Sequence, residues 1–368
     1  MTIIGERLSA AVADRDRSIT DAVARPGRDP RAEAAFERAL ELYRRGLTGY
    51  CYRLLGSWDE AEDAVQDAFL RAWRSLDAFE GRAQLRSWLY KIATNVCLTM
   101  LDGRRRRALP MDLEGPSSSD AILGERLPDG AWIQPIADRL AIGPSSDPAE
   151  LAASRDTIRL AFIAALQLLP PRQRAVLILR DVLRWRASEV AELLDATVVS
   201  VNGLLRRARA TLASRDLAAP PAAPDGERDT ELLARYVEAF ERLDVDTLVE
   251  LLHEDATLAM PPYTVWLQGP RSITAWLVAN ACGGSRRLPM EMNGSTAFAV
   301  YKPTSHDGTC EPFAIEIVEV AEHRITAIHA FIESSLFARL GLPPTLPKFA
   351  DQLRAAAIPD SATERHGR

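Results

Sequence analysis

The chain has 368 residues, of which 47% are hydrophobic and 26% charged, a composition typical of soluble globular proteins with two or three domains. No run of about 18 apolar residues occurs, and the first residues lack the basic-then-apolar pattern of a signal peptide. We therefore expect no membrane segment and a cytoplasmic protein. The four cysteines lie far apart and form no C-x-x-C pair, which excludes a typical zinc site or disulfide framework. Neither a metal nor a cofactor is predicted.

The net charge of −6 hides a pattern of alternating blocks. Lys and Arg exceed Asp and Glu by 3 in residues 40–107 and by 4 in residues 150–216. Asp and Glu exceed Lys and Arg by 5 in residues 108–149 and by 8 in residues 217–368. Two basic blocks separated by an acidic segment are what a nucleic-acid contact through two modules would produce.

Hydrophobic periodicity and the content of Pro, Gly and Ser divide the chain into modules and linkers. We predict a multidomain protein with two all-α modules, the second a helix-turn-helix, and an α+β domain after them. The predicted parts are a flexible N-terminus (1–36), a first helical module (37–107), an acidic Pro/Ser-rich linker (108–149), a second helical module (150–216), a short linker (217–228), an α+β domain (229–345) and a tail (346–368).

The first module contains an amphipathic helix that begins after Ser57. Ser57 and Glu60 form a capping-box pattern, in which Ser57 caps the helix and Glu60 reaches back to the cap. Apolar residues then recur at helical spacing as far as Trp73. The polar face carries Asp63 and Asp67 one turn apart, which makes an acidic ridge. By spacing alone this ridge is either an ordinary solvated surface or a contact site for a partner.

A second amphipathic helix follows at residues 85–101, with Arg86, Lys91 and Asn95 on its polar face. Four consecutive arginines come directly after it, at residues 104–107. A cation can stabilise a helix C-terminus through the helix dipole, but four exceed what a cap needs, and a phosphate backbone is the more economical partner. Aromatic and guanidinium surfaces together suit bases that have left the DNA stack.

Residues 63–73, DAVQDAFLRAW, and residues 85–95, LRSWLYKIATN, together resemble region 2 of extracytoplasmic-function sigma factors. In that family the first helix binds the clamp coiled coil of RNA polymerase, and the second helix with the loop before it melts and reads the −10 element. The resemblance assigns the polymerase contact to Asp63, Gln66, Asp67 and Leu70. Contacts with −10 DNA are assigned to Arg82, Arg86, Trp88, Lys91 and Asn95, and the arginine run adds Arg104, Arg105, Arg106 and Arg107.

In the second module a helix is predicted at residues 156–168, and the PPRQR segment at residues 170–174 opens the next one, because proline is favourable at a helix start. A short helix then leads through a turn at Asp195 to a basic helix capped by Ser200 or Thr197. A short helix, a turn and a basic helix are typical of a helix-turn-helix, whose second helix enters the major groove. A packed helix pair without DNA contacts is the alternative.

The PPRQR segment and SVNGLLRRAR, residues 200–209, resemble region 4 of the same family, which reads the −35 element. Asp195 stands where the turn usually has glycine, a position that needs positive φ, which Asp tolerates better than most residues. Leu204 stands where the family often has Arg or Lys, so the −35 sequence read here could differ from the common one. The contacts with −35 DNA are assigned to Ser200, Asn202, Arg206, Arg207 and Arg209.

The last domain is predicted to begin with helices over residues 232–252, broken near Asp244, and to continue with a strand, a helix and two hairpins. Asn293-Gly294 is a strong hairpin-turn signal. The order of elements resembles the SnoaL-like, NTF2-like cone, and sigma factors with this appendage form a known group, of which the actinobacterial sigma factor G type is the most similar. The linker residues Trp132 and Pro135 also resemble a Trp/Pro motif between the modules of such proteins.

Three roles stay open for this domain. NTF2-like cones include enzymes with an acid–base residue in the pocket, and His329 or His253, with Asp255 as partner, would be the candidates. A lone strand histidine is more often a packed or edge residue, so we predict that the protein is not an enzyme. The domain could instead contact a protein or bind a small molecule. A small-molecule pocket would be lined by Met260, Tyr263, Trp266, His329 and Phe331.

We therefore expect a sigma factor that binds core RNA polymerase and promoter DNA and whose C-terminal domain modulates its activity. An anti-sigma protein and a small ligand are further partners that this interpretation allows. The alternative is a helix-turn-helix regulator with a ligand-binding or, with less support, enzymatic SnoaL-like domain. Residues 57–107 distinguish the two, because a simple regulator has no use for such a module.

Overall fold

The computed structural model describes residues 16–23, 30–79, 81, 83–143, 147–214, 226–280, 284–304 and 309–347. The chain forms two compact units. The first unit contains Met1–Glu114, Arg126–Ala223 and the hairpin turn Glu291–Ser295. The second contains Gly115–Glu125, Pro224–Met290 and Thr296–Arg368. In the part of the chain that is described, no helix is long and apolar enough to span a membrane.

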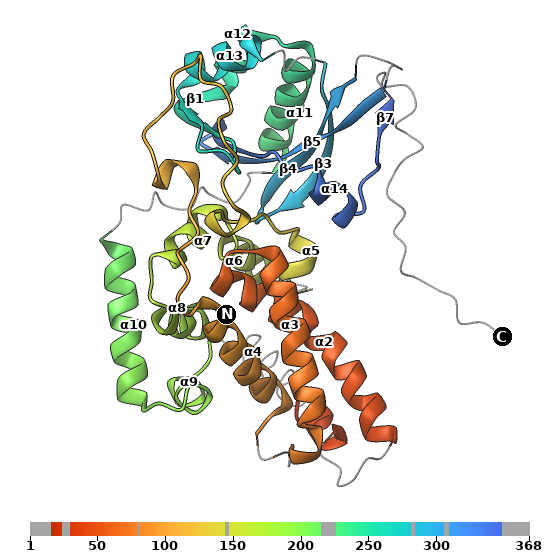
Figure 1. Ribbon diagram of the computed structural model, residues 1–368, viewed down its shortest axis with the longest axis vertical. Helices are drawn as coiled ribbons and strands as arrows, with labels where there is room; N and C mark the ends of the chain where they lie inside the picture. The colour runs from red at the N-terminus through yellow and green to blue at the C-terminus, as the bar shows by residue number, and fades with distance from the viewer. Residues whose placement is uncertain are drawn as a thin grey trace, which may run out of the picture. The chain divides into compact units, whose positions relative to one another are not determined.

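The first unit is helical (Figure 1). Short 3₁₀ helices lie at Leu76–Ala78, Pro110–Asp112 and Asp129–Ala131. A short π-helix lies at Ile178–Val182. The α-helices are α2 (Pro30–Leu55), α3 (Trp58–Arg74), α4 (Leu85–Leu101), α5 (Asp138–Ala141), α6 (Pro148–Asp156), α7 (Leu160–Gln167), α8 (Pro171–Leu177), α9 (Ala187–Leu193) and α10 (Val198–Ala213).

Helices α2, α3 and α4 pack on one another around an apolar core. The predicted stripe of α3 is buried as far as Ala72, including Ala64, Val65 and Phe69. Its last residue, Trp73, keeps 40% of its surface exposed. Tyr50 of α2 and Thr94 of α4 share a hydrogen bond of 2.8 Å inside this core. Burial of aromatic and aliphatic side chains is the main stabilising contribution to such a bundle.

Residues 16–23, in the predicted flexible N-terminus, are helical and contact α2 and the start of α4. The Asp16 carboxylate accepts a hydrogen bond of 2.6 Å from the Tyr43 hydroxyl. The hydroxyl of Thr20 accepts one of 3.0 Å from the backbone N–H of Leu85, at the start of α4. These polar partners hold a segment whose composition gives little hydrophobic signal.

The second helical module contains α7 to α10. The helix predicted over residues 156–168 is interrupted, because Ile158 is buried and its carbonyl accepts a hydrogen bond of 2.7 Å from the Asn293 amide; α7 begins only at Leu160. The turn prediction is confirmed, since Asp195 has a φ of +50°. Thr197 caps α10, and its hydroxyl accepts from the backbone N–H of Ser200 at 3.1 Å.

The second unit is an α+β domain, as predicted. Its antiparallel hairpins continue into a parallel pairing of β1 with β6, and the strand order is β2-β1-β6-β5-β4-β3, with β7 paired to β5. Its elements are the helices α11 (Gly226–Arg242), α12 (Val245–Leu251), α13 (Pro270–Ala279) and α14 (Ser335–Arg339), and the strands β1 (Leu252–Ala259), β2 (Trp266–Gln268), β3 (Arg286–Met292), β4 (Ser295–Pro303), β5 (Thr309–Ala321), β6 (Arg324–Phe331) and β7 (Leu346–Pro347).

Helices α11, α12 and α13 bury their apolar faces against the curved sheet, as Figure 1 shows for this unit. Tyr236 and Phe240 of α11 meet Phe298 of β4 and Leu258 of β1 in one core. The predicted turn between β3 and β4 is confirmed: Asn293 and Gly294 both have positive φ, 51° and 68°, as the two-residue hairpin turn of type I′ requires.

The predicted linker, residues 108–149, is not a uniform flexible segment. Residues 115–125 are part of the second unit, where the backbone N–H of Ser117 donates to the Trp266 carbonyl at 2.7 Å. The following stretch is part of the first unit, with Trp132, Pro135 and Ile136 buried. This stretch packs because it contains apolar residues, which are usually buried. A linker prediction based on Pro and Ser content does not take these residues into account.

Candidate polymerase and promoter interfaces

The polar face of α3 presents the residues predicted to bind polymerase. Asp63 and Gln66 are exposed, Asp67 is partly exposed, and the apolar side chain of Leu70 keeps 50% of its surface exposed. Asp67 pairs with Arg71 one turn later, at 2.8 Å, an exposed pair that contributes little to stability. A half-exposed leucine beside two carboxylates is the pattern of a protein-contact surface.

The polar face of α4 carries the side chains predicted to contact −10 DNA, and two of them contact the second helical module within the same unit. Lys91 Nζ lies 2.7 Å from the carboxylate of Asp195, in the turn before α10. The Arg86 guanidinium lies 5.3 Å from the ring centre of Trp185, a cation–π distance. Asn95 is exposed, and Arg82 lies outside the described residues.

Trp88 is the aromatic residue predicted to meet opened DNA. It is partly exposed, and its ring packs on Phe79 with 4.8 Å between ring centres and on Phe36 with 6.5 Å. Neighbouring aromatic rings stiffen an exposed ring and prepare it for stacking without a large loss of conformational freedom. The geometry of Trp88 therefore suits the predicted role.

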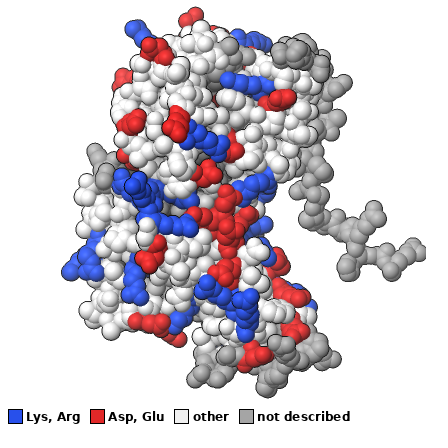
Figure 2. Space-filling model, in the orientation of Figure 1, with Lys and Arg blue, Asp and Glu red and all other residues white. Residues whose placement is uncertain are grey.

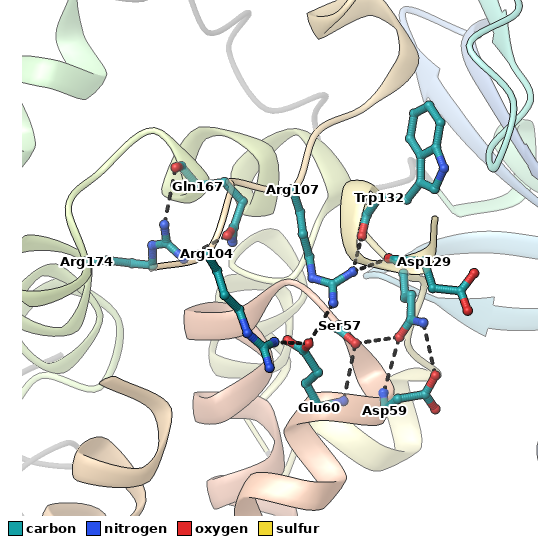
Figure 3. Close-up of polar contacts among 10 residues, drawn as sticks. Ser57, Asp59, Glu60, Arg104, Arg107, Asp129, Trp132, Gln167 and Arg174 are labelled. Carbon is teal, nitrogen blue, oxygen red and sulfur yellow. Dashed lines mark hydrogen bonds and ion pairs between the residues drawn. The ribbon is translucent and has the colours of Figure 1, made fainter. Parts of the chain in front are cut away.

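The arginine run that follows α4 divides into buried and exposed members, and Figure 3 shows the contacts of Arg104 and Arg107. Arg107 is buried and donates to the carbonyl oxygens of Asp129 and Trp132 at 2.5 and 2.6 Å. Its second guanidinium nitrogen lies 3.0 Å from Glu60, and Arg104 also pairs with Glu60. Sequence reasoning had Glu60 reaching back to the helix cap, but its carboxylate takes two charged partners instead.

The three other members of the run, Arg104, Arg105 and Arg106, are exposed. In the part of the chain that the structure describes, Arg105 and Arg106 pair with no carboxylate, so their charges are available for a phosphate. On the face drawn in Figure 2, groups of Lys and Arg side chains lie beside groups of Asp and Glu side chains. The arrangement favours the exposed members as DNA contacts and gives Arg107 a structural role.

A polar network at the start of α3 was missed by sequence reasoning (Figure 3). The Ser57 hydroxyl accepts from the backbone N–H of Glu60 at 3.2 Å and donates to the Gln134 side-chain carbonyl at 2.6 Å. The amide of Gln134 donates in turn to Asp59 at 3.0 Å. A linker residue thus completes the cap of the helix that carries the acidic ridge, which makes Gln134 a positioning residue for that surface.

Helix α10 presents the residues predicted to read −35 DNA. Ser200, Asn202, Arg206 and Arg207 are exposed, opposite the buried stripe of Val201, Leu205 and Ala208. Arg209 is also exposed but pairs with Asp181 through two hydrogen bonds of 2.6 and 2.9 Å.

Two apolar residues at the start of α10 were not singled out from the sequence. Among the residues that the structure describes, Val198 and Val199 keep 42% and 81% of their surface exposed. The N-terminal residues of a recognition helix face base edges, where apolar side chains contact thymine methyl groups. The exposure of these two valines indicates a contact surface, and it can be seen only in the three-dimensional structure.

Of the five residues predicted to line a pocket in the C-terminal domain, Met260 lines a cavity of about 30 Å³. The lining of this cavity does not include the other four, so the predicted pocket stays a prediction. This space is close to the volume of one water molecule. Arg287 and Glu316 also line it, and they form a fully buried ion pair of 3.1 Å.

The candidate catalytic residues are not arranged as an acid–base set. His329 is buried, its Nε2 lies 3.8 Å from Glu319, and burial lowers the pKa of its imidazole. His253 accepts a hydrogen bond at Nδ1 from the backbone N–H of Asp255 at 3.1 Å, so the carboxylate of Asp255 does not orient the ring through that contact.

Comparison with known proteins agrees with this geometry. Residues 39–107 match the family model of sigma-70 region 2, and residues 159–212 match that of sigma-70 region 4. The helical modules therefore define a sigma factor of the sigma-70 class. The chain is 43% identical over 330 residues to the ECF RNA polymerase sigma factor SigG of Mycobacterium tuberculosis, which covers 87% of this chain and 88% of that protein. The chain belongs to the ECF RNA polymerase sigma factors, which bind core polymerase and direct it to promoters.

A second relative allows a comparison of both sequence and fold. The chain is 30% identical over 221 residues to the ECF RNA polymerase sigma factor SigJ of Mycobacterium tuberculosis, over 59% of this chain and 62% of that protein. The crystal structure of SigJ matches with a TM-score of 0.51 and 21% identity, and covers 84% of this chain and 99% of that one. The likeness shows that the two proteins share a fold.

Proposed function

We propose that this sigma factor binds core polymerase through the acidic ridge of α3, reads −10 DNA with α4 and the exposed arginines, and reads −35 DNA with α10. The exposure of Asp63, Gln66 and Leu70 opposite the buried stripe from Ala61 to Ala72 carries this assignment, because these three side chains contribute nothing to the core. Since polymerase and promoter are its partners, the proposed location is the cytoplasm.

In vitro transcription with core polymerase tests the assignment. Wild-type protein should support initiation from a promoter with −10 and −35 elements, and core enzyme alone should not. Replacing Asn202 should lower initiation from that promoter, whereas replacing α3 residues should also remove the protein from polymerase pull-downs. Initiation that survives loss of the α3 surface would contradict the assignment.

We also propose that the C-terminal domain modulates this activity. The domain is acidic and both sigma modules are basic, so complementary charges are present in one chain. The turn Glu291–Ser295, encoded within the C-terminal domain, belongs to the first unit. There the Asn293 amide donates to the Tyr52 hydroxyl of α2 and to the Ile158 carbonyl, each at 2.7 Å. One buried side chain thus bridges residues of regions 2 and 4.

Three variants test this modulation. A chain that ends near residue 216 should change both promoter binding and transcription. Asn293→Asp keeps the turn, since Asp also tolerates positive φ, but it removes both amide donors and should reproduce part of the change. Trp132→Ala, at the buried linker residue, should do likewise if thermal melting shows it folded. Equal transcription by the full and shortened chains would contradict modulation.

An anti-sigma protein is a further proposed partner. It would block the proposed polymerase and promoter contacts by covering the surface of α3 or of α4. Co-purification from cells that express a tagged chain, with and without the α3 substitutions, tests it. The arrangement of His329 and His253 supports no enzymatic role, and we propose that the C-terminal domain acts by contact instead of catalysis.

A further inference from the structure

The first unit contains a cavity of about 700 Å³ that neither the polymerase surface nor the recognition helix uses. Its lining comes from the ends of α2 and α4, from the arginine run, from linker residues 127–131 and from α7 and α8. Figure 3 looks into this region. The volume is within the range of sites for nucleotide-sized ligands, about 300–1,000 Å³.

The charge of this cavity is strongly positive. Five arginines line it, Arg104 to Arg107 and Arg174, against a single carboxylate, Glu60. Glu60 is already shared by Arg104 and Arg107. Arg105 and Arg106 are left with exposed guanidinium groups that no carboxylate neutralises within the described residues. The cavity therefore has an excess of cationic hydrogen-bond donors.

The floor of the cavity holds a second, independent sign of an anionic ligand. Arg174 is 3% exposed, yet it has only neutral partners: Gln167 Oε1 at 2.7 Å and the backbone carbonyls of Leu54, Gln167 and Leu169. Burial without a counter-charge lowers the pKa of its guanidinium to about 10. A buried charge without an opposite charge is costly and uncommon.

Two donor atoms at this place also have no partner. Nε of Arg174 and Nε2 of Gln167 are buried and make no hydrogen bond with the described residues. Both residues line the cavity, and Gln167 is only 4% exposed. Buried donors normally have a partner, and one without a protein partner often has a bound water or ion beside it.

The remaining walls are apolar. Leu101, Leu127 and Pro128 lie on the side of the arginine run, and Leu169 and Pro171 lie on the side of α8. A ligand that satisfies both kinds of wall carries several negative oxygens on one part and a flat or apolar ring on another. An inorganic anion would use only the arginines.

We propose that this cavity binds a nucleoside polyphosphate, with phosphates on the arginines and the nucleoside against the leucine and proline walls. Arginine suits this role because its planar fork of donors matches phosphate oxygens. The lining residues come from both sigma modules, so the ligand bridges region 2 and region 4 of the first unit. The site shares Arg104, Arg105 and Arg106 with the proposed −10 contacts, so a bound nucleotide and promoter phosphates compete for these arginines, whereas the polymerase surface of α3 and the recognition helix α10 lie outside the cavity lining.

Isothermal titration of the full-length protein tests the proposal, with ATP, GTP, inorganic pyrophosphate and a nonspecific 20-base-pair duplex as probes. ATP or GTP should bind one to one, and pyrophosphate should bind about tenfold more weakly because it lacks the nucleoside. Arg105→Gln with Arg106→Gln should weaken nucleotide binding by about tenfold, since each loses a charge-assisted hydrogen bond. Both side chains are exposed, so the double variant should fold.

The matched control is Arg172→Gln, which removes one exposed arginine from α8 outside the cavity, and it should leave nucleotide binding unchanged. Gln167→Glu adds a carboxylate at the floor with little change of shape and should also weaken binding. Absence of saturable nucleotide binding, equal binding by the double variant, or binding of the duplex alone would overturn the proposal. Pyrophosphate binding as tightly as ATP would overturn the nucleoside part.

Discussion

The faces of α3 and α4 differ in one respect that bears on how this sigma factor starts to work. The residues of α3 assigned to polymerase are exposed and have no partner from region 4 among the contacts described above, whereas Arg86 and Lys91 of α4 are held by Trp185 and Asp195. The proposed polymerase surface is thus accessible in the same structure in which two residues of the proposed −10 surface contact region 4. This difference suggests an order of events, in which polymerase binds first and region 4 leaves α4 afterwards.

The largest effect is expected from reversing charge on the accessible surface. Asp63→Arg with Asp67→Arg should weaken binding to core polymerase by about 100-fold or more, because two carboxylates at the centre of the contact become cations. Both side chains lie outside the core, and the Asp67–Arg71 pair is exposed, so folding should be preserved. Pull-down with core enzyme measures the binding, and circular dichroism checks the fold.

A control with the same charge change separates contact from net charge. Glu254→Arg with Asp255→Arg reverses two exposed carboxylates on β1 of the second unit and should leave polymerase binding within about twofold of wild type. If both double variants lose binding equally, the α3 ridge has no special role in polymerase binding. The proposed difference between the accessible α3 face and the covered α4 face would then have no support.

The recognition helix is the second accessible surface, and Asn202 tests it. Asn202→Ala should reduce the preference for a matched over a mismatched −35 sequence by about tenfold, because a good base contact contributes about 1–3 kcal/mol of discrimination. Holoenzyme binding to the two promoters, measured at one salt concentration, gives the ratio. Arg209→Ala is the control, since Arg209 pairs with Asp181 and should affect both sequences alike. Equal losses on both promoters with Asn202→Ala would exclude base readout by this residue.

The sequence is informative wherever the cause of a structure is local. Helix caps at Ser57 and Thr197, the positive φ of Asp195 and the Asn293-Gly294 turn depend on neighbouring residues and match the structure. The assignment of Glu60 to a capping box fails, because its partners Arg104 and Arg107 come from a distant segment that no local rule includes.

The candidate sites follow the same division. The exposed faces of α3 and α10 could be predicted, since helical periodicity places their polar residues opposite the core. The contact of α4 with region 4 could not be predicted, because Lys91 and Asp195 are 104 residues apart and no sequence pattern indicates that they pair. The cavity with Arg174 was likewise invisible, since α8 reads as an ordinary helix start and burial of an arginine has no sequence signal.

The smallest expected effect concerns the contact that covers α4. Asp195→Asn keeps a residue that tolerates positive φ but removes the charge that holds Lys91, so single-stranded −10 DNA should bind more tightly, by about two- to fivefold. The gain is small because both side chains are partly exposed, and exposed pairs contribute about 0–1 kcal/mol. It should shrink as salt rises from 0.05 to about 0.5 M, where screening removes the pair in the wild type as well. Fluorescence anisotropy of a labelled strand measures it, and Glu192→Gln, which removes an exposed charge from α9, is the control. An identical gain in both variants would mean that general charge, and not release of Lys91, governs access to α4, and the proposed order of events would lose its support.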